Sequence, residues 1–436
     1  MCYGKRLIAS PEFVSLRFTV SRKPLLIIFI TVFIDLLGFA IVLPLLPRYG
    51  RHFEATKFEL GLLMASFSAM QFLFAPLWGR LSDRIGRRPV LIVGLAGSTI
   101  FYTLFALVTQ YGNAGPILGL SPLIWLFITR SGAGIAGATI PTAQAYIADS
   151  TDEKSRGKGM AIIGAAFGIG FTFGPLLGAW FVSNDADGVP SPAPGYVAAA
   201  LSALATLAAI ALLPESLKSD AASRPSRKWF DVAAFSKAMT RPHVGLLLAT
   251  IFLTTFAFAQ FETTLSMLTK ELGVGDRENF YVFAYIGFIL TLAQGMLVRR
   301  LLPKLGEFKM AVIGTVLMAV GLGLIGFAAT SGGVSLLWYV LPVCVVGFSC
   351  TTPSLNSLLS LNTSDDQQGE MLGVGQSMSS LARILGPVAG LSLLEYGRGL
   401  PYWMATGLMA AGVLMVLGLR SAATGSSRTE SASGGH

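Results

Sequence analysis

Four charged side chains stand inside long apolar stretches of this sequence: Asp35, Arg130, Glu262 and Arg383. A charge surrounded by hydrocarbon is costly, so such residues either pair with one another or mark a route for protons or ions. Asp35 lies well inside the first of these stretches. Because a carboxyl group in a low-dielectric cavity can take up and release a proton, we expect Asp35 to be a proton-binding residue.

The other three charges are natural partners for such a carboxyl group. Arg130 is expected to pair with Asp35 or to relay its proton, although its long side chain can instead reach the membrane surface. Asp35 can alternatively serve only as a hydrogen-bonding partner of a neighbouring helix. Glu262 is the second candidate for proton binding, since it lies nearer the end of its stretch. Glu262 and Arg383 either line a cavity or form a structural pair.

Amide side chains and an aromatic residue in these stretches are candidates for the wall of a substrate cavity. They offer hydrogen bonds or a flat apolar face within otherwise aliphatic sequence, although each amide taken singly can equally be a packed core residue. Together with Arg383, the candidates are Phe39, Gln71, Gln144, Gln260, Asn356 and Gln376.

The polar segment 79–88, GRLSDRIGRR, follows the second apolar stretch. Its first glycine would let a neighbouring helix approach closely, its acid would face a helix N-terminus, and its last two arginines would pair with an acid such as Asp149. Charge that only sets membrane orientation would explain the arginines but not the acid or the glycines. We expect a conformational latch formed by Gly79, Asp83, Arg84, Gly86, Arg87, Arg88 and Asp149.

Small residues dominate the stretch 158–183. They would give one helix a smooth face for close packing, and a proline would bend it. We expect this face to lie between two halves of the molecule, together with a second Gly-Pro pair far along the chain; ordinary small-residue packing is the alternative. The residues are Gly164, Gly168, Gly174, Pro175 and Gly178, with Gly386 and Pro387.

The elements that carry these residues must be membrane-spanning helices. Of the 436 residues, 53% are hydrophobic and only 13% are charged, whereas a soluble domain has about 25% charged residues. A span needs roughly 20 apolar residues, which leaves room for about twelve spans with short loops. The net charge of +9 lies mainly in the loops, as membrane orientation requires, so nucleic-acid binding is not expected.

Hydropathy therefore predicts an all-α integral membrane protein with twelve spans. We expect a cytoplasmic N-terminal segment at 1–24, a six-helix bundle at 25–213, a cytoplasmic linker at 214–242, a second six-helix bundle at 243–420 and a disordered cytoplasmic tail at 421–436. The predicted spans are 25–47, 60–81, 89–109, 123–147, 158–183, 196–213, 244–268, 279–298, 308–329, 335–361, 370–394 and 400–420.

The two predicted bundles resemble each other in sequence. A constant shift of 212 residues aligns 139–142 with 351–354, and it also aligns the Gly-Pro pair at 174–175 with that at 386–387. One unchanged offset indicates duplication rather than chance matches of glycine and proline. Parallel six-helix repeats are typical of transporters whose substrate site lies at the midplane between two halves.

These motifs resemble those of the twelve-helix drug:proton antiporters of the major facilitator superfamily, in particular its tetracycline-resistance-like branch. The segment 79–88 matches G-x-x-x-D-R-x-G-R-R at every defined position, and 35–47 is similar to D-x-x-G-x(5)-P-x-x-P. The segment 130–134 is similar to R-x-x-x-G, and 170–179 to G-x-x-x-G-P-x-x-G-G, with Ala179 in place of the last glycine. The resemblance implies the major facilitator fold and proton-coupled export of an amphipathic, drug-like molecule by alternating access.

One departure from that branch concerns the substrate. Tetracycline exporters carry further acids in their third and ninth spans, whereas 89–109 and 308–329 contain none here, which weighs against tetracycline itself. A proton-coupled importer of a small solute is an alternative within transport, and a transporter-like sensor or scaffold is an alternative of another class.

No enzyme activity, cofactor or metal is expected. The sequence has no phosphate-binding loop or nucleophile triad, and its cysteines, Cys2, Cys344 and Cys350, lack metal-ligand spacing. The expected partners are protons, a small-molecule substrate and the lipid bilayer, with the chain acting as a monomer in the cell membrane (inner or plasma membrane).

Membrane orientation gives the first testable prediction. Lys and Arg are frequent in 214–242 and absent from 184–195, so the positive-inside rule places the first segment in the cytoplasm and the second outside. A reporter fused within 214–242 should give a cytoplasmic signal, and one within 184–195 an external signal, with both termini cytoplasmic. Reversed signals would contradict the whole map.

Overall fold

The computed structural model describes residues 22–151, 166, 168–182, 189–217, 239–331, 333–363 and 368–433. Within these ranges most residues lie in helices, and extended pairing is limited to one bridge between Ile117 and Leu120. Eleven of the described helices are long and apolar enough to cross a membrane, and a shorter apolar helix, Gly168–Ala179, lies in the predicted fifth span. The prediction of an all-α membrane protein is confirmed.

Helices suit an apolar environment because each satisfies its backbone hydrogen bonds within one segment. Eleven of the predicted spans coincide with the long helices, and most of their ends differ by a few residues; the fifth, 158–183, lies partly outside the described residues and holds the helix Gly168–Ala179. The elements are α1 (Arg22–Val42), α2 (Leu46–His52), α3 (Lys57–Ile85), α4 (Arg87–Tyr111), α5 (Pro122–Ala136), α6 (Ile140–Ser150), α8 (Ala193–Leu212), α10 (Pro242–Glu271), α11 (Asp276–Leu292), a π-helical turn (Ala293–Val298), α12 (Arg299–Leu305), α13 (Glu307–Ser331), α14 (Val334–Leu361), α15 (Gln368–Tyr396) and α16 (Leu400–Ser433).

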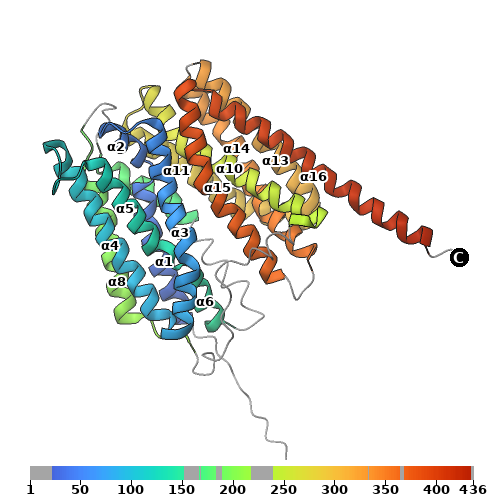
Figure 1. Cartoon of the computed structure of the whole chain (residues 1–436), viewed down its shortest axis with the longest axis horizontal. Coiled ribbons are helices and arrows are strands. Elements are labelled where there is room, and N and C mark those ends of the chain that lie inside the picture. Colours follow the sequence, from blue (N-terminus) through green and yellow to red (C-terminus); the bar gives the residue numbers. More distant parts are fainter. Residues whose placement is uncertain are drawn as a thin grey trace, which may run out of the picture.

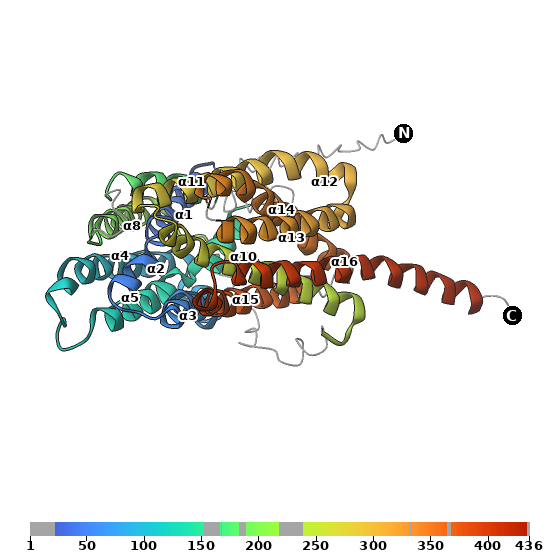
Figure 2. The same ribbon diagram turned by 90° about the horizontal axis from the view of Figure 1, so that it is seen from above.

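These helices form two bundles that lie side by side (Figure 1). The first bundle contains α1 to α8 with the helix Gly168–Ala179, and the second contains α10 to α16. The bundles meet through α3 and α15 on one side and through the helix Gly168–Ala179 and α11 on the other (Figure 2). The last helix, α16, continues beyond the bundle to Ser433, so its backbone is helical where a disordered tail was expected.

The first span is interrupted by its prolines. α1 ends at Val42, and α2 begins after a short turn that contains Pro44, with Pro47 in its first turn. Proline lacks a backbone N–H and is tolerated at the start of a helix but not in its interior, which explains both the break and the restart. As a result, α2 turns Arg48 toward the second bundle.

The two bundles touch closely at one end, which we call the distal end because it lies away from the first residue of α1. There, a methyl group added to Gly61 of α3 would lie 2.7 Å from the Cα atom of Val388 in α15. A methyl group added to Gly178 would lie 2.5 Å from the ring of Phe280 in α11. Glycine is therefore required for this close approach of the bundles.

The opposite end of the molecule, which we call the proximal end, has glycines on α3, on α15 and in the turn after α11 that no described atom covers. A methyl group would meet no described atom within 4 Å at any of three glycines. These are Gly79 of α3, Gly295 in the π-helical turn after α11, and Gly373 of α15. The expected close approach at Gly79 is therefore not made in this conformation. Among the described residues, the bundles are packed at the distal end and apart at the proximal end.

The Gly-Pro pairs pack differently from the expectation. Gly168 and Gly178 do face α11 of the other bundle, but Gly174 faces Ala40 of α1 and Gly386 faces Phe256 of α10, each within its own bundle. The helix that carries each Gly-Pro pair thus packs against the first helix of its own repeat, and the expected interface role of Gly174 and Gly386 is wrong. Gly164 lies outside the described residues.

Two glycines of α3 provide a matched test of this packing. Gly61→Ala should lower the thermal unfolding temperature of the purified protein, because overpacking against the Val388 backbone costs about 1–3 kcal/mol. Gly79→Ala should leave it unchanged or raise it, since alanine favours a helix over glycine by about 1 kcal/mol. Equal destabilisation by both variants would show that the bundles are also packed at the proximal end.

Candidate functional site

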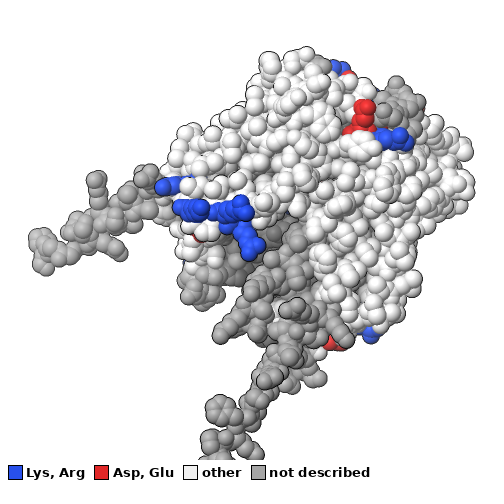
Figure 3. Space-filling view, turned by 180° about the vertical axis from the view of Figure 1, so that it is seen from behind, with Lys and Arg blue, Asp and Glu red and all other residues white. Residues whose placement is uncertain are grey.

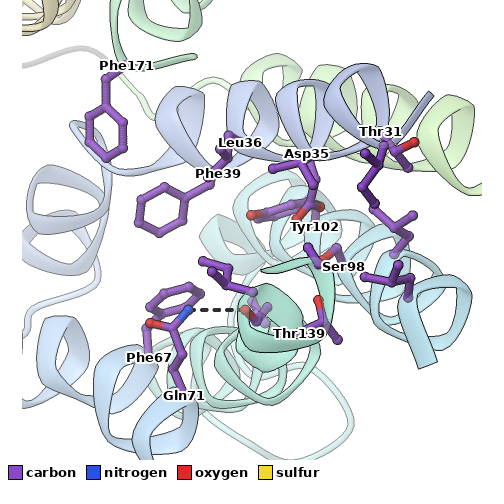
Figure 4. A pocket seen from close by; sticks show the side chains of 18 of the residues that line it. Thr31, Asp35, Leu36, Phe39, Phe67, Gln71, Ser98, Tyr102, Thr139 and Phe171 are labelled. Carbon is purple, nitrogen blue, oxygen red and sulfur yellow. Dashed lines mark hydrogen bonds between the residues drawn. The ribbon is translucent and has the colours of Figure 1, made fainter. Parts of the chain in front are cut away.

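A cavity lies between helices of the first bundle, and one of its lining residues comes from the second bundle (Figure 4). Its polar wall residues come from α1, α3, α4 and the turn before α6, and three phenylalanine rings give it an aromatic face. One wall residue, Arg383, comes from α15 of the second bundle. The side chains used below are Asp35, Phe39, Phe67, Gln71, Ser98, Tyr102, Phe171 and Arg383.

Asp35 lines this cavity from the middle of α1. Its Oδ1 accepts a hydrogen bond of 3.3 Å from the Ser202 hydroxyl, and Tyr102 of α4 points toward it (Figure 4). Gly38, one turn along α1, makes this possible: a methyl group there would lie 3.2 Å from the Ala198 carbonyl oxygen and 3.5 Å from the Tyr102 ring. The Asp-x-x-Gly spacing thus places the carboxyl group and lets α8 and α4 approach it.

Arg130 is not the direct partner that the sequence suggested. It is buried in α5, and no acid among the described residues lies within 4.0 Å of it. Its guanidinium group instead stacks over Phe67 at 4.5 Å and Phe39 at 5.8 Å from the ring centroids. Tyr102, which lines the cavity with Asp35, interacts electrostatically with both Asp35 and Arg130. Cation–π contact stabilises a buried cation, which explains how Arg130 is tolerated there.

The two charges of the second bundle are neighbours without direct contact. Glu262 of α10 and Arg383 of α15 interact electrostatically, but in the described part of the chain they form no ion pair within 4.0 Å. Arg383 is exposed and reaches the cavity wall, whereas Glu262 is half-buried and does not line it. The sequence left two interpretations open, that Glu262 and Arg383 line a cavity or that they form a structural pair. The structure favours the first for Arg383, with Glu262 as an acid near it.

The expected cavity residues fall into two groups. Phe39, Gln71 and Arg383 line the cavity, and the Gln71 amide donates 3.1 Å to the Gly137 carbonyl oxygen. Gln260 is instead buried inside the second bundle, where its amide donates to the Pro401 carbonyl oxygen. The other three, Gln144, Asn356 and Gln376, are exposed and do not line it. The sequence does not determine how each helix is rotated about its axis, so it cannot tell which of these side chains face the cavity.

Sequence reasoning missed Tyr102, Ser98 and Phe67. All three are ordinary helix residues in apolar stretches, and only the packing of α1 and α4 against α8, and of α3 and α4 against α5, brings them to the cavity. Phe171 had a usable signal, since the 212-residue shift aligns it with Arg383.

The arginine-rich segment forms a cluster at the proximal end. The Arg87 guanidinium lies 2.5 Å from Asp83 and 3.1 Å from Asp149, and it donates 2.7 Å to the Ser82 hydroxyl. Arg88 does not pair with an acid through its side chain but donates to the Ile210 carbonyl oxygen. Arg84 is exposed. All of these residues belong to the first bundle, so in this conformation the cluster joins segments of one bundle and not the two bundles.

The anion at the helix N-terminus is Glu215 and not Asp83. The Glu215 carboxylate accepts hydrogen bonds from the backbone N–H groups of Arg87 at 2.9 Å and Arg88 at 3.1 Å, at the start of α4. The side chain of Asp83 is 60% exposed in the last turn of α3. Glu215 arrives there because α8, which precedes it, packs along α4. Gly86, at φ 107°, joins α3 to α4, and a side chain there would collide with Glu215.

Arg48 joins the bundles at the distal end. Its side chain is only 2% exposed and lies 2.8 Å from the Asp276 carboxylate. It also donates 3.0 Å to the Val274 carbonyl oxygen and 2.9 Å to the Thr269 hydroxyl. Because a buried arginine is costly unless its donors are satisfied, these bonds fix α2 against the loop between α10 and α11. We call this group, with Pro44 and its partners below, the distal clamp.

Further bonds between the bundles surround Arg48. The Pro44 carbonyl oxygen accepts hydrogen bonds from the Ser266 hydroxyl at 2.6 Å and the Asn279 amide at 3.3 Å. A break in the first helix leaves this carbonyl available to the other bundle. Nearby, Lys57 lies 2.9 Å from Glu271 and donates 2.8 Å to the Leu394 carbonyl oxygen.

Charge on the visible surface is confined to the two ends of the molecule, and the flank between them shows none (Figure 3). This pattern suits a protein whose flank contacts lipid. Among the described residues, no group of three His, Cys, Asp or Glu side chains is arranged to hold a metal ion.

Comparison with known proteins gives consistent relatives. A family model described as Major Facilitator Superfamily matches residues 28–387. The tetracycline resistance protein, class C, of Escherichia coli is 32% identical over 380 residues, which cover 84% of this chain and 89% of that protein. Multidrug resistance protein 2 of Bacillus subtilis (strain 168) is 26% identical over 410 residues, covering 91% and 94%. The crystal structure of the human organic anion transporter MFSD10 (TETRAN) has a TM-score of 0.65 at 25% identity, covering 91% and 99%.

The distal clamp gives a prediction about conformation. Removing one partner of a buried ion pair costs about 3–5 kcal/mol, so Arg48→Met should loosen the distal end. In a variant without native cysteines, Ser266→Cys should react slowly with a maleimide, because Ser266 is buried beneath Pro44. Adding Arg48→Met should speed labelling several-fold.

Arg51→Met is the matched control, because Arg51 is an exposed arginine of the same short helix and its guanidinium bonds only the nearby Ala55 carbonyl oxygen. If Arg48→Met leaves labelling as slow as Arg51→Met does, Arg48 does not hold the bundles together.

Proposed function

The chain belongs to the major facilitator superfamily, and on that basis we propose that it exports amphipathic, drug-like molecules in exchange for protons. It is a multi-pass membrane transporter and not an enzyme. The proposal concerns three further properties: the direction of transport, the coupling ion and the class of substrate. It further places the proximal end and both termini in the cytoplasm of a protein that acts as a monomer in the cell membrane.

The observation that carries proton coupling is the setting of Asp35. This carboxyl group lies in the middle of a span, at the wall of a cavity, with hydroxyl groups as its close neighbours. No Lys or Arg among the described residues forms an ion pair with it. A carboxyl group without a fixed counter-ion can be neutral or charged, and access to water from one side or the other decides which state prevails.

Alternating access explains how this exchange can drive export. In the present conformation the distal clamp is closed and the glycine faces of the proximal end are uncovered. In the opposite conformation we expect Gly79 and Gly373 to be covered and the bonds of Arg48 to be broken. Loss of a proton from Asp35 to one side and uptake from the other would link this change to the proton gradient.

The names of the relatives support the substrate class. Two are resistance proteins, for tetracycline and for multiple drugs, and a third is an organic anion transporter. All three names refer to organic molecules rather than to sugars or inorganic ions. The aromatic cavity wall formed by Phe39, Phe67 and Phe171 supports the same class, since flat rings bind planar apolar bodies.

Asp35→Asn tests the coupling step. The asparagine keeps the size and hydrogen bonds of aspartate but cannot exchange a proton at this site. In proteoliposomes, the variant should still bind an amphipathic dye that the wild type transports, although more weakly where the dye carries an amine, and should still allow downhill exchange. It should lose accumulation driven by an imposed pH gradient, by tenfold or more.

Glu262→Gln is the matched comparison, because it removes the other intramembrane acid in the same assay. Accumulation by Asp35→Asn at the wild-type rate would contradict the assignment and would transfer the coupling role to Glu262 if only Glu262→Gln loses it.

A further inference from the structure

We propose that the cavity selects zwitterionic amphipaths, with Arg383 binding the acidic group of the ligand and Asp35 binding its amine. This inference rests on the proposed function and makes its substrate class more specific. It depends on three features of the cavity: a cation supplied by the second bundle, an acid supplied by the first, and aromatic rings on the wall that both share.

The internal duplication indicates that the charge of Arg383 is not needed for folding. Phe171 and Arg383 are related by the 212-residue shift, and each precedes the Gly-Pro pair of its bundle by three residues. Both line the same cavity, one from each bundle. Because a phenylalanine fills the equivalent position in the first bundle, helix packing does not require an arginine there. The difference between the two positions therefore concerns what the cavity binds.

Arg383 is also free to bind a ligand. Its side chain is exposed toward the cavity, and within the described ranges it makes no ion pair within 4.0 Å. Glu262 interacts with it only at longer range. A guanidinium group offers a planar pair of donors that matches a carboxylate or a similar acidic group. In a cavity partly removed from water, such a bond is stronger than at an open surface.

Asp35 supplies the opposite end of the site. The hydrogen bond that its Oδ1 accepts from the Ser202 hydroxyl is long at 3.3 Å, and a carboxylate has acceptor capacity left for an ammonium group. The same cavity wall carries the rings of Phe39, Phe67 and Phe171, with centroid separations of 4.9 Å for the first pair and 5.9 Å between Phe39 and Phe171. A planar apolar body would contact these rings.

Charge balance then favours a ligand that carries both groups. Among the described residues, the charged groups on the cavity wall are Asp35 and Arg383, whereas Arg130 and Glu262 do not line it but interact electrostatically with the wall residues Tyr102 and Arg383. An amine alone would displace the proton of Asp35 but leave Arg383 without a partner. An acid alone would pair with Arg383 but would not displace that proton, so no exchange would follow. A zwitterion does both.

The test uses three forms of one fluorescent quinolone: the parent, which carries a carboxylate and a secondary amine, its N-acetyl derivative, which lacks the basic amine, and its ethyl ester, which lacks the carboxylate. Binding to the full chain in proteoliposomes is measured by fluorescence. The parent should bind about tenfold or more tightly than either derivative, as expected for a charge-assisted hydrogen bond. Arg383→Gln should remove the advantage of the parent over the ester while leaving the affinity for the ester and the advantage over the N-acetyl form unchanged, and Arg383→Lys should restore part of the lost advantage.

Arg300→Gln serves as the control, since Arg300 is an exposed arginine of the same bundle outside the cavity. The proposal is overturned if the ester binds as tightly as the parent, if Arg383→Gln weakens all three forms equally, or if none of them binds the folded wild type. Failure of proton coupling is a separate result. It would appear as gradient-driven accumulation by Asp35→Asn, while the wild type still binds the three quinolone forms in the predicted order of affinity.

Discussion

The cost of placing a charge in an apolar layer governs how this molecule is built. Each charge inside a span has a different solution to that cost. Arg48 has several partners across the bundle interface through its two terminal nitrogens, and Arg130 stacks on aromatic rings. Asp35 and Arg383 instead face a cavity, where water or a ligand can reach them. Charges that are satisfied by the protein hold its shape, and charges that are left to a cavity are available for function.

The same constraint shapes the interface between the bundles. Polar bonds join the bundles beside Pro44 and Arg48, where a helix break exposes a backbone carbonyl group and an arginine finds several acceptors. Lys57 adds an ion pair with Glu271, and Arg277 donates to the Ala179 and Val182 carbonyl oxygens. Between these bonds the bundles also touch through glycines, whose small size allows the helices to come together.

The cluster at the proximal end holds three helices of the first bundle together. Glu215 fixes the start of α4, and Gly86 gives it the space to do so. Arg87 ties α3, α4 and α6 of the first bundle together. With these bonds made inside one bundle, that bundle can move as a unit, and Gly79 beside the cluster remains uncovered.

The sequence by itself determined the helices, their approximate ends and the presence of two repeats, because long apolar runs leave the backbone no alternative to a helix and duplication leaves a constant offset. It also singled out Asp35, since an acid in such a run stands alone. Only the tertiary structure decided the partners. Arg48 bonds Asp276 at a separation of 228 residues, and Glu215 caps a helix that begins 128 residues earlier. Contacts of this kind depend on how whole helices rotate and pack against one another, and the local pattern of apolar residues does not contain that information.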